Sequence, residues 1–337
     1  MASGKPPTID DVARESGYSV ATVSRALRGL PNVAPSTRGI IERVAERMAY
    51  QPDPAATSLA TGRSRTVAMA VPGLDSWYFG QVMAGVEAVL AEAGYDLHVF
   101  SVDSAERRRR TATGPLVKRA DGLLLVDLAL ADIEEHHLAQ AGLSVVTVGT
   151  TTASFPSVSI DDVGVAELAV SHLADLGHRR IGLLKGETDD PLHFDVPRSR
   201  HRGYRNALLR SGLSVDPALE RSGNFSVEGG AEAMTELLAI DDPPTAVFAM
   251  SDEMAFGAMR ALGERGHSVP DDVSIIGVDN HEFSSVIGLT TVDQAVGEQG
   301  VAAAHLLIRG MEVGSGDRTG YQVPITLVER RSTTRRR

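Results

Sequence analysis

Residues 8–29, TIDDVARESGYSVATVSRALRG, have the pattern of two short helices joined by a turn. Thr8 is followed three residues later by Asp11, which is a capping-box pattern, and Gly17 can end the first helix. Ser19 can then cap the second helix. A third helix is predicted from Pro35, and five apolar residues on it can close a small core: Ile40, Ile41, Val44, Ala45 and Met48.

The second helix is expected to have two different faces, because its apolar residues recur at helical spacing. Val23, Ala26 and Leu27 fall on one side. The other side shows small apolar groups and an arginine, which suits a DNA major groove, where arginine can bind guanine N7 and O6. From the pattern alone, an ordinary helical hairpin remains the alternative. The candidate DNA-contacting residues of this predicted helix-turn-helix head (1–50) are Thr8, Ser19, Val20, Ala21, Thr22, Ser24 and Arg25.

The charge of the chain is divided unevenly along its length. The 337 residues carry a net charge of −11, but residues 1–65 alone carry +3 and the remainder −14. A basic head is what contact with phosphates requires, and an acidic body discourages nonspecific coating of DNA. The division therefore favours a DNA-binding head on a body with another task.

After the head, residues 51–62 have the signals of one more short helix. Asp53 can cap it, Pro54 suits its first position and Gly62 can end it. At about eight residues it is too short to be stable alone, so it is expected to order only when it is paired or docked on DNA. A simple linker is the alternative.

The head and the residues after it, TIDDVARESGYSVATVSRALRG and ERVAERMAYQPDPAATSLATGRS, resemble the lactose/galactose repressor (LacI/GalR) family. The resemblance implies a hinge at 51–65 that pairs across a dimer and places Leu59 in the minor groove, with Ala56 and Ala60 beside it. Thr57 stands where many family hinges have arginine. A homodimer on palindromic operator DNA is also expected on physical grounds, because one recognition helix makes too small a contact.

From residue 66 the sequence pattern changes, and short apolar runs alternate with amphipathic segments. This pattern predicts doubly wound parallel sheets covered on both faces. The resemblance implies the bilobed fold of periplasmic binding proteins, here an effector-binding and dimerisation core at 66–330. Lobe 1 is expected at about 66–160 plus 291–319, and lobe 2 at about 161–290 plus 320–330, followed by a basic tail at 331–337. The predicted strands are 67–71, 95–100, 122–126, 145–149, 180–184, 245–250 and 273–278.

Ligands of open α/β sheets bind beyond the carboxyl ends of the strands, so the residues there are candidate ligand contacts. Asp127 and Asp279 end two predicted strands, and Ser251 and Asp252 follow a third. Asp252 has a helix cap as its alternative role. The resemblance adds the remaining candidates for the effector pocket: Tyr78, Phe79, Arg200, Phe225 and Gln294. Aromatic faces with Asp, Arg and Gln suit a polyol.

Several classes of function are disfavoured by what the sequence lacks. Without cysteine there are no disulfides, thiolate zinc sites or cysteine nucleophiles. No Walker loop, GxGxxG, GxSxG or HExxH motif occurs, so no cofactor, metal or enzymatic activity is expected. No signal-peptide core and no run of 18 apolar residues occurs, which favours a cytoplasmic protein without membrane contact.

The sequence thus predicts a transcriptional regulator, a repressor, whose bilobed body senses a saccharide. Two alternatives stay open. One keeps the regulator but gives it a purine, a phosphorylated metabolite or no effector, and the other is a free-standing sugar-binding protein or a small-ligand enzyme.

Overall fold

The computed structural model describes residues 6–51, 62–114, 119–187, 195–314 and 318–336. The chain divides into two compact units, Met1–Ser64 and Arg65–Arg337. We call them the head and the core.

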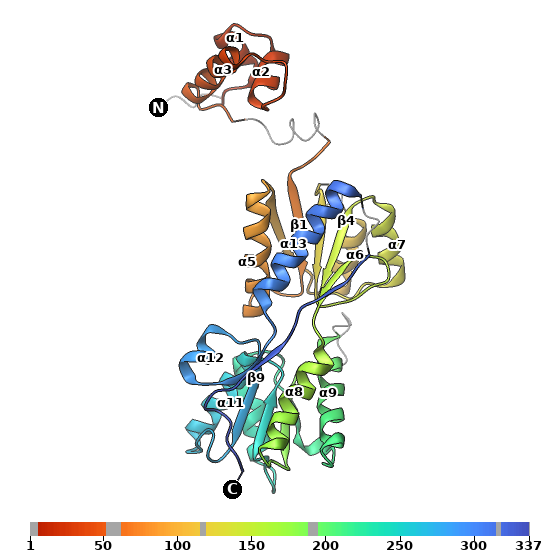
Figure 1. Ribbon diagram of the computed structural model, residues 1–337, viewed down its shortest axis with the longest axis vertical. Coiled ribbons are helices and arrows are strands. Elements are labelled where there is room, and N and C mark those ends of the chain that lie inside the picture. Colours follow the sequence, from red (N-terminus) through yellow and green to blue (C-terminus); the bar gives the residue numbers. More distant parts are fainter. Residues whose placement is uncertain (1–5, 52–61, 115–118, 188–194, 315–317, 337) are drawn as a thin grey trace. The chain divides into compact units, whose positions relative to one another are not determined.

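The head consists of three helices, α1 (Ile9–Ser16), α2 (Val20–Leu27) and α3 (Pro35–Arg47) (Figure 1). The backbone N–H and the hydroxyl of Thr8 both donate to Asp11 Oδ2, at 2.9 and 2.7 Å, which fixes the start of α1. Gly17 ends α1 in the left-handed conformation, with φ of 76°, where a side chain would be strained. Ser19 Oγ accepts the backbone N–H of Thr22 and caps α2. The predicted caps of both helices are confirmed.

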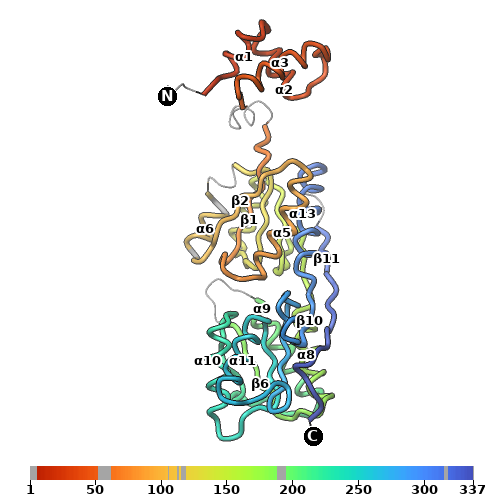
Figure 2. The backbone as a smooth tube through the Cα atoms, turned by 90° about the vertical axis from the view of Figure 1, so that its left-hand side faces the viewer, coloured from red at the N-terminus to blue at the C-terminus, as the bar shows by residue number. Residues whose placement is uncertain are grey.

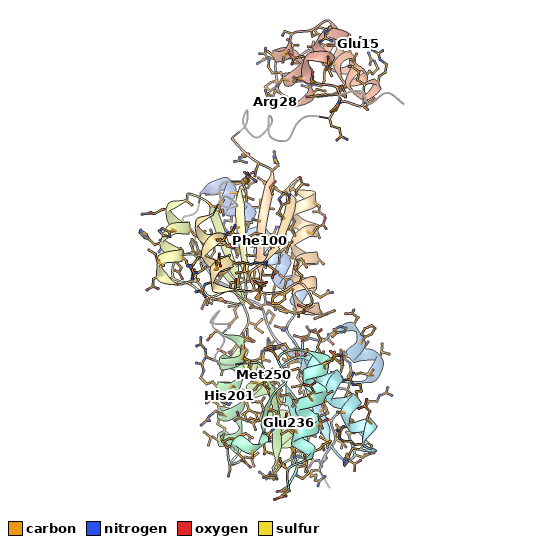
Figure 3. All side chains as sticks on the ribbon, turned by 180° about the vertical axis from the view of Figure 1, so that it is seen from behind. Glu15, Arg28, Phe100, His201, Glu236 and Met250 are labelled. Atoms are coloured by element: carbon orange, nitrogen blue, oxygen red, sulfur yellow. The ribbon has the colours of Figure 1, made fainter. Side chains whose placement is uncertain are left out.

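One apolar core holds the three helices together, and its members include Val12, Val23 and Ile41, each fully buried. The prediction for α3 was wrong at one position, because Ile40 is 38% exposed. Ile40 and Ile41 are adjacent, and residues one apart on a helix point about 100° away from each other, so the small core can take only one of them. Glu15 of α1, labelled in Figure 3, lies on the head. It accepts a hydrogen bond from Arg47 at 2.7 Å, which ties α1 to the end of α3.

Lobe 1 of the core is a six-stranded sheet in the order β11-β5-β4-β3-β1-β2, all parallel. Its strands are β1 (Thr66–Val71), β2 (Asp96–Ser101), β3 (Gly122–Val126), β4 (Ser144–Val148), β5 (Ser157–Ser159) and β11 (Tyr321–Gln322). Its helices are α5 (Trp77–Glu92), α6 (Ala105–Thr113), α7 (Asp132–Gln140) and α13 (Val296–Val313).

Side chains of β1 alternate between two cores, as the period of a strand requires. Val67 and Met69 join the core under α5 and α13, whereas Ala68 and Ala70 join the core that includes Leu138 of α7. The sheet is therefore covered on both faces (Figure 1), which explains why its central strands read as continuous apolar runs.

Lobe 2 is a second six-stranded sheet, in the order β12-β10-β9-β8-β6-β7, parallel except for the antiparallel pair of β10 and β12. Its strands are β6 (Ile181–Lys185), β7 (Glu220–Ser222), β8 (Ala246–Ala249), β9 (Ser274–Val278), β10 (Thr290–Asp293) and β12 (Thr326–Val328). Its helices are α8 (Asp162–Asp175), α9 (Val196–Arg210), η1 (Pro217–Leu219), α10 (Val227–Leu238), α11 (Asp252–Glu264) and α12 (Glu282–Ile287).

The chain passes between the lobes three times: from β5 to α8, from β10 to α13 and from β11 to β12. Two predicted boundaries differ from these crossings. Residues 290–293 form β10 in lobe 2, where they pair with β9, and residues 321–322 form β11 in lobe 1, where they pair with β5. Figure 2 shows the last segment running from β11 beside lobe 1 to the C-terminal end of the chain beside lobe 2.

The expected basic tail, as far as residue 336, is part of lobe 2. The Ile275 N–H donates to Ser332 O at 2.8 Å, and Arg336 N–H donates to Leu176 O at 2.8 Å. Ser332 is 2% exposed. Backbone groups of the tail thus satisfy backbone groups at the sheet and at the end of α8, which its basic composition did not indicate.

Candidate functional site

The outer face of α2 is open, as predicted. Ser19, Val20, Ala21 and Arg25 are exposed, and Thr22 and Ser24 are half-buried. The opposite face is closed, with Val23 fully buried and Ala26 1% exposed. Arg25 Nε donates to the carbonyl of Ala21, one turn earlier, at 3.1 Å. This bond holds the guanidinium along the exposed face without using its terminal nitrogens.

The other predicted DNA-contacting residues lie in two places. Thr8 is half-buried at the start of α1, where its hydroxyl is bonded to Asp11. Ala56, Leu59 and Ala60 fall at 52–61, outside the described residues.

The core contains a cavity of about 510 Å³ lined by residues of both lobes. Eight of the nine predicted pocket residues line it: Tyr78, Phe79, Asp127, Arg200, Phe225, Ser251, Asp279 and Gln294. They come together because most of them follow strands whose carboxyl ends face the cavity. Asp127 follows β3, Ser251 follows β8 and Asp279 follows β9.

Asp252 is the exception, and its predicted place in the pocket is wrong. It is fully buried within lobe 2, where Oδ2 accepts from Ser284 Oγ at 2.6 Å and from the His281 N–H at 2.9 Å. Its Oδ1 accepts from Thr291 Oγ1 at 2.7 Å. The cap of α11 is Ser251, whose Oγ accepts the Met254 N–H. Asp252 therefore ties α11 to the segments after β9.

Arg200 of α9 is 4% exposed and is held by two acceptors. Its Nε donates to Asp162 Oδ1 at 2.8 Å, and its Nη1 donates to the carbonyl of Met250. Met250, labelled in Figure 3, directly follows β8. Burial raises the pKa of Asp162, while the Arg200 guanidinium opposes that rise. Asp162 also lines the cavity. The sequence did not indicate it, although Asp162 lies shortly after the end of β5, at the first position of α8.

A chain of hydrogen bonds crosses the cavity from one lobe to the other. Gln294 Nε2 donates to Asp279 Oδ1 at 2.5 Å, and Gln299 Nε2 donates to the backbone carbonyl of Gln294 at 2.8 Å. The hydroxyl of Tyr78 donates to Gln299 Oε1 at 3.2 Å. Asp279 belongs to lobe 2, and Tyr78 and Gln299 belong to lobe 1. The amide groups thus connect the lobes along one wall of the cavity.

One oxygen of the Asp127 carboxyl group accepts no hydrogen bond from the described residues. Its side chain is buried, and Oδ1 has no hydrogen-bond partner among the described residues. Burial raises the pKa of Asp127 to about 8, the negative charge of Asp162 adds to the rise, and Arg200 opposes it. Gly149 packs against this carboxyl group, and a Cβ at residue 149 would overlap Asp127 Oδ1. Asp127 itself has φ of 49°, an uncommon conformation that is often found at functional sites.

Aromatic side chains form the apolar part of the cavity wall. Tyr78 and Phe79 lie in the first turn of α5 and meet edge to face, with ring centroids 5.3 Å apart. Phe225 lies in the loop between β7 and α10 at φ of 54°. Its ring packs so close to Gly186 that a Cβ there would overlap it.

The lobes also touch at the edge of the cavity, in contacts that the sequence did not indicate. Trp77 Nε1 of lobe 1 donates to Glu282 Oε2 of lobe 2 at 2.5 Å, and the Trp77 ring lies 4.6 Å from the ring of His281. Ser76 Oγ donates to Glu253 Oε2 at 3.4 Å.

The described part of the chain offers neither a metal site nor a membrane-spanning helix. Within residues 6–51, 62–114, 119–187, 195–314 and 318–336, no group of three His, Asp or Glu side chains is arranged to hold a metal. None of the helices described is long and apolar enough to span a membrane.

Comparisons with known proteins agree with both units. Residues 8–53 match the model for bacterial regulatory proteins of the lacI family, and residues 170–333 match a periplasmic binding protein-like domain. Over 92% of both chains, 36% of residues are identical to the transcriptional repressor CytR of Escherichia coli K12. Catabolite control protein A of Priestia megaterium is 33% identical over 97% of this chain and 99% of its own.

Solved structures are similar across nearly the whole chain. The lac repressor dimer bound to operator and an anti-inducer is 28% identical, with a TM-score of 0.86, and covers 98% of this chain and 100% of its own. A CelR–cellobiose complex is 30% identical, with a TM-score of 0.71, over 97% and 99%. A ribose-bound regulator from Enterococcus faecium is 29% identical, with a TM-score of 0.72, over 81% and 100%. The chain therefore belongs to the lacI family of bacterial regulatory proteins, and it is a DNA-binding transcriptional regulator with a helix-turn-helix head and a periplasmic-binding-protein-like core.

Proposed function

We propose that this regulator is a repressor that binds palindromic operator DNA as a homodimer and is controlled by a saccharide held in the cavity between the lobes. The observation that carries the proposal is the cavity itself: both lobes contribute polar side chains to it, and the Tyr78–Gln299–Gln294–Asp279 hydrogen bonds run from one lobe to the other. A molecule bound there contacts both lobes at once.

The lining favours a saccharide. Tyr78, Phe79 and Phe225 offer apolar ring faces, on which the C–H face of a sugar can stack. Arg200 and Asp279 offer fixed donors and acceptors for hydroxyl groups. Relatives solved with cellobiose and with ribose support the same class of ligand.

On the DNA side, we assign recognition to the exposed face of α2. Arg25 is the residue suited to a guanine, and Val20 and Ala21 are suited to thymine methyl groups. We assign contacts with phosphates or base edges to the hydroxyl groups of Ser19, Thr22 and Ser24. We assign to Thr8, whose hydroxyl already donates to Asp11, a contact beside the phosphates. Within the assigned hinge at 51–65, we give Leu59 the role of a minor-groove wedge, flanked by Ala56 and Ala60.

Effector binding changes DNA affinity only if the ligand binds two arrangements of the core unequally. A saccharide that contacts both lobes favours the arrangement in which they are close together. In a dimer this changes the distance between the two segments that join the cores to the heads. A coupling of about 1–3 kcal/mol between the sites would change operator affinity roughly 5- to 150-fold.

The test starts from a DNA sequence selected by the full-length protein from a randomised pool. Its affinity is then measured by fluorescence anisotropy with and without each member of a panel of mono- and disaccharides. We expect a palindromic site, and one or more sugars that lower the affinity at least fivefold. Failure to select any sequence would overturn the assignment of DNA recognition, whereas purines acting in place of sugars would overturn the ligand class.

A matched pair of variants locates the effector. Phe225→Ala removes a ring from the cavity, and Tyr321→Ala removes an exposed ring outside it. Because stacking on an aromatic ring contributes about 0.5–1.5 kcal/mol, Phe225→Ala should raise the half-maximal effector concentration up to about tenfold, while Tyr321→Ala should not. Equal behaviour of the two variants would place the effector elsewhere.

A further inference from the structure

Arg65 is the first residue of the core, and it has a backbone conformation that is uncommon for a residue with a side chain. Its φ is 55°, in the left-handed region. The Arg65 N–H donates to Asp121 Oδ2 at 2.9 Å, and the Arg65 carbonyl accepts the Asp96 N–H at 2.9 Å. Lobe 1 thus satisfies both backbone groups, which holds the turn at the point where the assigned hinge ends and β1 begins.

The side chain of Arg65 contacts the end of α5. Its Nη1 donates to the carbonyl of Ala93, the C-cap residue of α5, in a long hydrogen bond of 3.5 Å. Its guanidinium carbon lies 5.3 Å from the centroid of the Tyr95 ring, which is 9% exposed. The last turn of α5 has no basic residue of its own. Arg65 therefore supplies the positive charge that stabilises a helix C-terminus, and the buried ring holds that charge in place.

The first turn of α5, at the opposite end of the helix, lies at the cavity. Tyr78 and Phe79 line the cavity, and Trp77 donates to Glu282 of lobe 2. The helix has 16 residues and contains no proline, so its two ends are about 24 Å apart. A continuous helix is rigid on this scale, so a displacement of its first turn also displaces its last turn.

α5 lies beside α13 in lobe 1 (Figure 1). The two backbones are in direct contact, because a Cβ at Gly85 would overlap the carbonyl of Gly297 and a Cβ at Gly300 would overlap the carbonyl of Val82. α13 begins shortly after β10, where the chain crosses from lobe 2. Such close packing leaves little room for one helix to move without the other. A change in the arrangement of the lobes therefore displaces α5 and α13 together.

We propose that Arg65 is a positioning residue for DNA binding, which joins the C-terminal end of α5 to the start of β1 so that the arrangement of the lobes sets the direction in which the assigned hinge leaves the core. The inference rests on the proposed function, because it requires operator affinity to depend on the lobes. It adds the residue through which a change at the cavity reaches the hinge.

A direct contact with DNA is the rival role of Arg65, because its side chain is exposed. A contact with a phosphate strengthens binding by the same factor in every arrangement of the lobes. A positioning residue instead changes the ratio of the affinities of two arrangements. That ratio is the quantity to measure.

The lobes can be held in one arrangement without any effector. The 337 residues include no cysteine, so an introduced pair reacts alone. Ser76 of lobe 1 and Glu253 of lobe 2 meet at the cavity, where their side chains are 3.4 Å apart. The full-length Ser76→Cys/Glu253→Cys protein is linked with a short bismaleimide, and the same protein capped with a monomaleimide is the unlinked control. Affinity for the selected DNA, measured by fluorescence anisotropy, should differ about 5- to 150-fold between the two.

Substitutions in this double-cysteine protein then test Arg65. Arg65→Gly suits a φ of 55° but lacks the guanidinium, so the linked and unlinked forms should differ less than twofold. Arg65→Lys keeps a positive charge and should retain part of the difference. Tyr95→Leu should reduce the difference about two- to fivefold, whereas Tyr95→Phe, which keeps the ring, should not. Arg119→Gly removes the same charge from an exposed turn of lobe 1 and should retain the full difference.

The role of Arg65 is overturned if Arg65→Gly keeps the full difference between linked and unlinked protein. Weakening of both forms by one factor is the result expected of a phosphate contact, and it also overturns the proposal. In either case the proposed control by the lobes stands. If linking changes nothing when Arg65 is present, the control of DNA binding by the lobes fails and the role of Arg65 fails with it, while selection of a DNA sequence by the protein still supports DNA recognition.

Discussion

The outer face of α2 and the wall of the cavity are built by opposite physical rules. On α2, the side chains that face outward are exposed or half-buried and bond within one turn of their own helix, as Arg25 does with Ala21. In the cavity, Arg200 and Asp279 are almost fully buried, and the partners of the polar groups come from distant segments. Polar groups in the first region can be changed without disturbing the fold, whereas those in the second are part of the fold.

This difference also sets what each region can do. An exposed face remains flexible and hydrated until it meets DNA, and its charge acts through phosphates over a Debye length of about 8–10 Å. A buried wall presents fixed donors and acceptors, which discriminate between ligands because an unpaired group there is costly. Substitutions of buried polar groups in the cavity wall should therefore change stability, whereas substitutions on the outer face of α2 should change DNA binding alone.

The largest effect is expected for Arg200→Ala. It leaves Asp162 buried without its cation, and breaking a buried pair in this way costs about 3–5 kcal/mol. Urea unfolding of the core should show the loss directly. Arg200→Ala combined with Asp162→Asn should recover part of it, because the uncompensated charge is gone. If Arg200→Ala unfolds at the wild-type urea concentration, the buried polar groups of the cavity wall do not stabilise the fold.

The second effect concerns pH and Asp127. Its pKa is about 8 in the folded chain and near 3.8 when unfolded, so between these values the unfolded chain releases a proton that the folded chain retains. Asp127 therefore lowers stability progressively as pH rises from about 4 to 8, and the penalty is complete above pH 8. Tyr78, Asp162 and Arg200 are the charged or titratable groups that interact with it.

Asp127→Asn should remove this penalty. We expect the variant to be more stable than wild type by on the order of 2–5 kcal/mol at pH 8, and little different at pH 4. Thermal unfolding from pH 4 to 9, with Asp96→Asn at an exposed site on β2 as the control, measures the change. A stability difference that does not grow with pH would mean that Asp127 is already ionised in the empty cavity.

The sequence predicted what depends on local pattern. Strand β3 (Gly122–Val126) was predicted at its observed bounds, because its continuous apolar run and the residues that flank it specify it. Asp127 and Asp279 were found because parallel strands end at one edge. The same reasoning placed Asp252 in the cavity wrongly, since residues on either side of a helix start point in different directions, and only tertiary contacts decide which one faces the ligand.

What the sequence did not predict depends on partners far away in the chain. Asp162 meets Arg200 across 38 residues, Gln299 meets Tyr78 across 221, and Trp77 meets Glu282 across 205. No periodicity or cap marks such pairs. The crossing points between the lobes were displaced by a few residues for the same reason, because a short strand such as β11 is specified by the sheet it joins.

A smaller effect, on binding alone, is expected at the head. Arg25→Ala should weaken binding to the selected DNA by roughly 1–3 kcal/mol per half-site and relax base preference at one position, because a bidentate contact with guanine is lost. Stability of the head should not change, since Arg25 is exposed and bonds only to its own helix. Binding to every single-base variant of the site separates this from a phosphate contact, which would weaken all sequences equally.

The smallest effect lies at the contact between the lobes. Trp77 is the only tryptophan of the 337 residues, so its fluorescence reports its hydrogen bond to Glu282 and its packing on His281. The carboxyl side chain of Glu282 is 61% exposed, and one hydrogen bond there contributes about 0.5–1.5 kcal/mol. Trp77→Phe keeps a ring against His281 but removes the donor, so it should weaken effector binding by up to about tenfold with little change in melting temperature. In wild type, the effector should shift the emission of Trp77, and Glu282→Gln should reduce that shift. Emission that is identical with and without the effector, in both proteins, would show that closing of the lobes does not pass through this contact.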